Sequence, residues 1–223
     1  MSYIFDRLKQ HTQDFQDLLS TNLDPVDEGH DYPWLNDVYT GCNIRRAHLD
    51  VVDSTDHRKL YMMHLCLFPA TTSKAPVYGF DLIAGPNKIT GAFHDFSPIV
   101  EKHKLNKEFK RMVEDYSWSK TRTLPQWAEM IFSKHIVTAS NIKDHDEIER
   151  VLSLSLDTLS LYINTLKEEK IDDTIDSTVL QNIYCHYQKQ NPHTPRVMNS
   201  LGFDAETVSD FIDNCLFPEI EYS

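Results

Sequence analysis

The sequence predicts an α/β fold, a three-layer α/β/α sandwich with a central antiparallel β-sheet, formed by residues 1–223 as a single domain. Between Val38 and Phe96, short segments rich in β-branched or alternating apolar residues follow one another with only tight turns between them. Segments with helical periodicity lie before and after this block. Because no long crossover helices separate the strands, neighbouring strands should pair antiparallel.

The predicted elements follow in chain order. Apolar residues recur at helical spacing over residues 3–19, before the turn signals Asp24-Pro25 and Glu28-Gly29. Strands are then predicted over residues 38–53, 59–68, 77–84 and 88–96, separated by turn residues such as Gly85-Pro86-Asn87. Beyond Pro98 the apolar spacing lengthens, which predicts amphipathic helices over residues 99–116, 145–168, 174–190 and 204–217.

Composition excludes several classes of function. The formal net charge of −12 disfavours DNA or RNA as a partner, and the six glycines form no phosphate-binding loop motif. The four cysteines include no CxxC pair, so we expect reduced thiols rather than a zinc ribbon or a disulfide framework. No apolar run approaches the length of a membrane span. We therefore expect a soluble, cytoplasmic monomer that binds neither nucleic acid nor membrane.

Ionisable residues inside the predicted strands are the main functional signal. His48 and Asp50 share one face of their strand, while His64 and Asp81 lie between apolar neighbours. A five-residue turn over 54–58 would place His48 opposite His64, with Asp50 one step along the same face. Imidazoles and carboxylates that converge on a buried face are costly unless they pair with each other or with a ligand. Such groups can exchange protons near neutral pH.

Two alternatives remain open on residue types alone. A single buried histidine or aspartate is more often a hydrogen-bonded core group than a catalytic one. His48, Asp50 and His64 also match the donors of a two-histidine, one-carboxylate metal site. Asp95 lies just before Ser97-Pro98, where an aspartate either caps a turn or faces a ligand.

The sequence resembles the ferredoxin-dependent bilin reductases, and among them the phycocyanobilin-forming enzymes most closely. Six segments carry the resemblance, in family order: residues 46–51 (RAHLDV), 63–69 (MHLCLFP), 76–85 (PVYGFDLIAG), 92–98 (AFHDFSP), 124–133 (LPQWAEMIFS) and 184–191 (YCHYQKQN). The resemblance implies an α/β/α sandwich that binds biliverdin IXα between the sheet and the C-terminal helices. It also implies that external ferredoxin delivers single electrons, so that bilin radicals form, with no bound metal or flavin.

The resemblance also implies roles for individual residues. Asp81 matches the aspartate that protonates biliverdin, His64 its partner histidine, and His48 a second histidine of the proton network. Asn191 falls in the stretch that lines the pocket. Thr138 and His193 occupy what look like the positions of basic contacts to the propionates, so we assign both, together with Asp95, to substrate binding.

Two departures from the family pattern affect the expected product. Asp50 stands where phycocyanobilin-forming members have a glutamate that helps protonate the D-ring vinyl group, and aspartate is shorter by about 1.3–1.5 Å. Pro192 stands near the position of a second catalytic aspartate of phycoerythrobilin-forming members. We therefore expect phycoerythrobilin from a divergent, phage-type member, with phycocyanobilin or non-catalytic bilin binding as alternatives.

An acidic ferredoxin needs a basic docking face on this acidic chain. The expected face is the helix after Pro98, with the alternative that its charges are simply solvated. Its basic residues are Lys102, Lys104, Lys107, Lys110 and Arg111.

Overall fold

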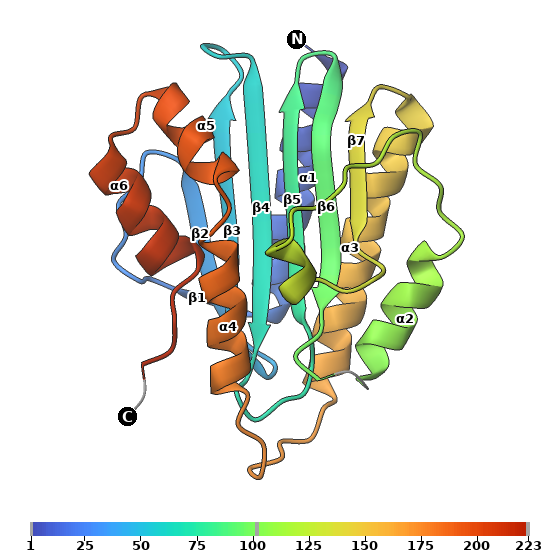
Figure 1. Cartoon of the computed structure of the whole chain (residues 1–223), viewed down its shortest axis with the longest axis vertical. Coiled ribbons are helices and arrows are strands. Elements are labelled where there is room, and N and C mark those ends of the chain that lie inside the picture. Colours follow the sequence, from blue (N-terminus) through green and yellow to red (C-terminus); the bar gives the residue numbers. More distant parts are fainter. Residues whose placement is uncertain (1, 101–102, 222–223) are drawn as a thin grey trace.

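A computed structural model describes residues 2–100 and 103–221, and within them seven antiparallel strands form one sheet whose spatial order follows the sequence (Figure 1). The strands are β1 (Asp24–Val26), β2 (Leu35–Gly41), β3 (Ile44–Ser54), β4 (Leu60–Pro69), β5 (Val77–Gly85), β6 (Lys88–Ser97) and β7 (Val137–Ile142). Each strand pairs with its chain neighbour, which is the meander that the tight turns predict.

Helices cover both faces of this sheet, so the predicted sandwich is confirmed. In Figure 1, α1 (Tyr3–Asn22) and α3 (His145–Lys167) lie behind the sheet, and α4 (Thr178–Gln188) lies in front of it. The remaining helical segments are α2 (Lys104–Val113), η1 (Ala128–Met130), α5 (His193–Leu201), α6 (Ala205–Asp210) and the π-helical η2 (Phe211–Leu216). No helix in the described part of the chain is long and apolar enough to cross a bilayer.

The alternating pattern of the strands separates two cores. Leu49, Leu65 and Phe80 point toward α1 and α3 and belong to the larger hydrophobic cluster, each with no more than 1% of its surface exposed. Val52 and Phe68 point to the opposite face and pack with residues of α4, α5, α6 and η2. His48, Asp50, His64 and Asp81 share this second face, so the C-terminal helices lie over these four ionisable residues.

Several predicted boundaries differ from the structure. The strand predicted over 38–53 is two strands, because Cys42 and Asn43 adopt φ angles of 51° and 59° and form a tight hairpin turn. The helix predicted over 99–116 begins only at Lys104, where His103 Nδ1 accepts a hydrogen bond from the amide of Leu105 at 3.2 Å. Residues 101 and 102 lie outside the described residues.

The predicted register of the β3–β4 hairpin is wrong by two positions. The loop comprises residues 55–59, so Asp50 lies opposite His64, and His48 lies opposite Cys66. The Asp53 carboxylate accepts hydrogen bonds from the amide and hydroxyl of Thr55, at 3.0 and 2.6 Å, and thereby fixes the start of the turn. A slip of two residues leaves each side chain on the same face, so the predicted convergence survives the wrong register.

Candidate active site

One row of side chains crosses the sheet on the face that the C-terminal helices cover. Its members are direct cross-strand neighbours on β2 to β7: Asn36, Asp50, His64, Asp81, Phe93 and Thr138. Directly opposed residues of antiparallel strands project to the same face. The fold therefore places two carboxyl groups on either side of one imidazole.

His64 lies between the two carboxyl groups of the row and contacts one of them, that of Asp50. Its Nδ1 atom lies 3.2 Å from Oδ1 of Asp50, and the two side chains are 15% and 6% exposed, respectively. Asp81 is the direct neighbour of His64 on the next strand and is half-buried. The centroid of the Phe217 ring lies 5.6 Å from that of His64. Because His64 and Asp81 keep part of their side chains exposed, a ligand can contact the row directly.

Asp81 is held where it can carry a proton near neutral pH. Burial, reinforced by the negative charge of Asp50, raises the pKa of Asp81 to about 6, although His64 and Arg122 act in the opposite direction. A carboxyl group with this pKa is protonated in a sizeable fraction of molecules at pH 6 to 7 and gives up its proton readily. Asp81 therefore has the properties of a general acid.

His48 lies beside the row in a closed environment of its own. Its Nε2 atom is 2.6 Å from Oδ1 of Asn36, which also accepts a bond from Sγ of Cys215 at 3.2 Å. Burial, with Arg46 and His64 contributing, lowers the pKa of His48 well below its ordinary value, so the ring is neutral. An amide oxygen can only accept, so Nε2 carries the proton and Nδ1 is an acceptor. Nδ1 is buried without a hydrogen-bond partner among the described residues.

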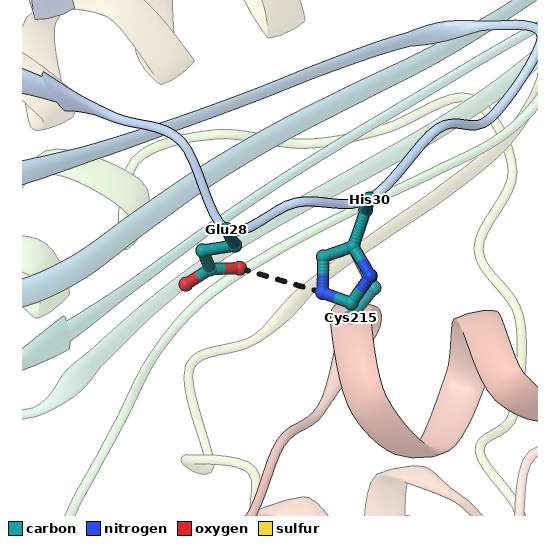
Figure 2. Close-up of side chains that lie close together, drawn as sticks. All are labelled: Glu28, His30 and Cys215. Atoms are coloured by element: carbon teal, nitrogen blue, oxygen red, sulfur yellow. Dashed lines mark ion pairs between the residues drawn. The ribbon is translucent and has the colours of Figure 1, made fainter.

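Among residues 2–100 and 103–221, two clusters have donor atoms that suit a metal ion. Ligand atoms of His48, Asp50 and His64 lie within 4.8 Å of one another, so the metal hypothesis stays geometrically possible there. Figure 2 shows the second cluster, Glu28 with His30 and Cys215.

In the second cluster, Arg46 already binds the carboxylate. It donates to both oxygens of Glu28 at 2.8 and 2.7 Å and to the Cys215 carbonyl at 2.7 Å. The guanidinium therefore holds the β1–β2 connection against η2, where it would repel a cation.

The contacts of Asp95 support the turn-capping alternative rather than ligand binding. Its carboxylate accepts from the hydroxyl of Ser97 at 2.9 Å and from the amide of Ser133 at 2.7 Å, and the Ser133 hydroxyl donates to it as well. Burial raises the pKa of Asp95 to about 6 in spite of these bonds. The side chain thus fastens the segment after η1 to the sheet.

The other predicted substrate contacts lie in two places. Thr138 is buried within the row, opposite Phe93. Asn191 lies in the connection from α4 to α5, and its side chain accepts a hydrogen bond from the amide of His193, the first residue of α5, at 3.0 Å. The His193 side chain is exposed. Thr138 therefore lies in the same row as Asp81, with Phe93 between them. The Asn191 side chain instead accepts a hydrogen bond at the start of α5.

The predicted docking face on α2 carries fewer free charges than the sequence indicates. Arg111 pairs with Glu108 at 2.7 Å, and Lys110 lies 4.0 Å from Glu114. Lys104 and Lys107 are exposed and form no ion pair with any described residue, while Lys102 lies outside the described residues.

Aromatic side chains line the surroundings of the row. Phe211 lies 6.5 Å from His48 between ring centroids, and Tyr184 packs so closely that a Cβ on Gly79 would come within 3.3 Å of its hydroxyl oxygen. A cavity of about 470 Å³ lies past Val52 toward the end of β3, where Trp34, Phe203 and residues of α1 line it, and no residue of the row contributes to its walls. Apolar aromatic walls with a few convergent polar groups suit a flat conjugated ligand.

Comparisons with known proteins identify the family and agree with the fold. The family model described as ferredoxin-dependent bilin reductase matches residues 13–218. The chain is therefore a bilin oxidoreductase that belongs to the ferredoxin-dependent bilin reductase family, as the sequence resemblance predicts. It is 27% identical to a phycocyanobilin:ferredoxin oxidoreductase of Prochlorococcus marinus, over 96% of this chain and 90% of that relative.

Solved structures show the same architecture. A protein named PcyX is 32% identical, with a TM-score of 0.69, and the match covers 96% of this chain and 99% of that chain. Phytochromobilin synthase from tomato, solved in complex with biliverdin, is 14% identical with a TM-score of 0.75 over 93% of this chain and 82% of that chain. The second likeness shows the fold alone.

Sequence reasoning missed several residues that shape the site. Asn36 holds His48, Cys215 contacts Asn36 from η2, and Arg122 lies close enough to influence Asp81. The first two lie far apart in the chain, so no local pattern connects them. Arg122 follows Thr121 in an irregular segment with no periodicity.

Proposed function

We propose that this protein reduces biliverdin IXα to phycoerythrobilin with four electrons from external ferredoxin, with no resident metal or flavin. The observation that carries the proposal is the Asp50–His64–Asp81 row, which offers protons on a partly exposed sheet face. Family membership supplies ferredoxin as the electron donor, and a relative of the same fold is solved with biliverdin. Stoichiometric iron or zinc in the purified protein would contradict the absence of a resident metal.

The reaction adds four electrons and four protons to the bilin. Ferredoxin supplies the electrons one at a time, so the bilin passes through radical states that become more basic as they gain charge. Asp81 gives a proton to the bilin, and His64 passes the next proton to Asp81 from the side of Asp50. His48, held neutral by burial and oriented by Asn36, presents Nδ1 as an acceptor that completes the network.

The position of Asp50 supports phycoerythrobilin as the product. Its carboxylate lies 3.2 Å from Nδ1 of His64, so it is directed toward the neighbouring strand and not outward from the sheet toward a ligand. A glutamate would extend about 1.3–1.5 Å further from the strand. Because a misplacement of about 1 Å can reduce a proton-transfer rate about a hundredfold, the D-ring vinyl group stays unreduced and the C15=C16 bridge and the A-ring take the electrons.

An anaerobic assay with biliverdin IXα, a ferredoxin and its reducing system tests the proposal. Products are separated by chromatography against bilin standards. Phycoerythrobilin is expected. Phycocyanobilin, the product that the names of several relatives indicate, would keep the reductase activity and overturn the product assignment. Tight binding of biliverdin without reduction would make the protein a bilin carrier.

The Asp50→Glu variant tests the product assignment within this chain. The longer side chain is expected to divert part of the product to phycocyanobilin. Asp37→Glu is the matched control, because Asp37 lies on the neighbouring strand β2 and accepts a hydrogen bond from Gln16 of α1 at 2.7 Å, on the opposite face of the sheet. Unchanged product ratios in Asp50→Glu would remove Asp50 from the choice of product.

A further inference from the structure

A short segment extends the sheet beyond β7 and carries two cations. Thr121 forms a bridge with Ala139, the amide of Arg122 donates to the Thr138 carbonyl at 3.0 Å, and the amide of Ser140 donates to the Lys120 carbonyl at 2.8 Å. Thr121 and Ala139 share the face toward α3. By alternation, Lys120 and Arg122 project to the opposite face, which carries the Asp81 row.

The guanidinium of Arg122 lies directly over β6 on that face. One of its terminal nitrogens donates to the Thr90 carbonyl at 3.0 Å, and its Cζ atom is 5.9 Å from the centroid of the Phe93 ring. A Cβ on Gly91 would stand 3.6 Å from this Cζ and 3.1 Å from the Phe93 ring. The absence of a side chain at Gly91 therefore makes room for the guanidinium and for Phe93 beside it.

The charge of Arg122 is unpaired within the part of the chain that the structure describes. No carboxylate among residues 2–100 and 103–221 pairs with it, although the chain carries a net charge of −12. The Thr90 carbonyl occupies one of its five N–H donors, and the others remain available. Lys120 is also exposed and lacks an ion pair with any described residue.

A buried hydroxyl lies beneath this charge. Ser140 is fully buried, is directly opposite Gly91, and shares the face of Thr138. Its Oγ atom has no hydrogen-bond partner in the described part of the chain. Because this Oγ atom is closed off from solvent, a carboxylate held by Arg122 above Gly91 gains the Ser140 hydroxyl as a donor when the covering side chains of Phe93 and Arg122 shift.

We propose that Arg122, with Lys120 and Ser140 beside it, binds a propionate carboxylate of the bilin. The inference rests on the proposed function. Strand spacing and rise place Gly91 roughly 8–10 Å from Asp81 across the sheet, with the partly exposed ring of Phe93 between them. A tetrapyrrole whose reacting carbon lies at Asp81 reaches Arg122 with a propionate side chain. The cation thus comes from the segment beside β7, whereas the strand itself offers the neutral Thr138.

Equilibrium binding of two ligands by two variants tests the proposal. Biliverdin IXα and its dimethyl ester, in which both carboxylates are capped, are titrated into the wild type, Arg122→Gln and Arg111→Gln. Arg111 is the matched control because it is an exposed arginine on α2 that is already paired with Glu108. Arg122→Gln is expected to bind biliverdin about tenfold to a hundredfold more weakly, the range for a charge-assisted hydrogen bond, and to bind the diester as the wild type does.

The possible outcomes separate this inference from the proposed function. Equal losses for both ligands would show a structural role for Arg122, and no loss for either would remove it from binding. In both cases the proposed reduction of biliverdin by the wild type is unaffected, so only the assignment of Arg122 to propionate binding is overturned. A wild type that binds neither ligand would overturn the proposed function and the anchor together. A parallel Lys120→Gln variant should show a smaller loss of the same ligand dependence, since a lysine makes no bidentate contact.

Discussion

The histidines of the strands are in opposite situations on the two faces of the sheet. On the face toward α3, both ring nitrogens of His94 have partners at 2.7 Å, the Gly79 carbonyl and the Thr158 hydroxyl, and burial lowers its pKa to about 4. On the other face, His64 contacts only a carboxylate and remains partly exposed, and His48 keeps one ring nitrogen without a partner among the described residues. Both faces are packed with apolar side chains. Among the strand histidines, the fully bonded His94 lies in the core, and the two with unused hydrogen-bonding capacity lie in the site. His11 of α1, whose Nδ1 atom also lacks a partner among the described residues, shows that an unbonded nitrogen by itself does not identify a site.

The largest effect is expected from Asp81→Asn. The variant should bind biliverdin within a few-fold of the wild type but lose about 10²–10⁴-fold in turnover, because electrons arrive without the matching proton. Anaerobic turnover, with absorption and electron paramagnetic resonance spectra of the stalled bilin radical, measures this. Turnover near the wild-type rate would remove Asp81 from the mechanism.

Matched substitutions of His64 and His94 sharpen the comparison of the two faces. His64→Gln should reduce turnover by about a hundredfold with little change in thermal stability. His94→Gln should destabilise the fold by about 1–3 kcal/mol, because it disturbs two buried hydrogen bonds, and leave the activity of the folded fraction intact. Thermal unfolding and turnover of both variants provide the measurements. Loss of stability in His64→Gln together with loss of turnover in His94→Gln would refute the assignment of His64 to the active site and His94 to the core.

The pH dependence of stability gives the smallest expected effect. Asp81 has a pKa of about 6 in the folded protein, above its ordinary value of 3.8, so the folded state binds its proton more tightly. Its contribution to stability is complete below about pH 4 and is lost as the pH rises through about 6. Asp81→Asn should therefore gain stability relative to the wild type between these values, by about 2 kcal/mol at most because the group is partly exposed.

Urea unfolding of both proteins at pH 4 and at pH 8 measures this gain. Asp53→Asn provides the control, because Lys9 and Thr55 lower the pKa of this exposed carboxyl group instead of raising it. A stability difference that does not change with pH would contradict the raised pKa of Asp81.

Local periodicity in the sequence was sufficient to predict much of the fold. Alternation along the strands, helical spacing outside them and tight turns between them predict the sandwich, and they predict that Asp50, His64 and Asp81 share a face. Each of these signals lies within about ten residues of sequence. The same signals missed β7, because the irregular segment that leads into it from Arg122 to Ile136 carries no pattern.

The amino-acid sequence by itself determined the family, the layers and the identity of the ionisable residues on one face. Only the tertiary structure decided which of them touch. Period-two alternation does not distinguish registers that differ by two residues, so the loop after Asp53 decided that Asp50 rather than His48 lies opposite His64. Packing between distant segments also decided three other contacts, which no local pattern predicts. These are the contacts of Asp95 with Ser133, of His48 with Asn36, and of Arg122 with the backbone around Gly91.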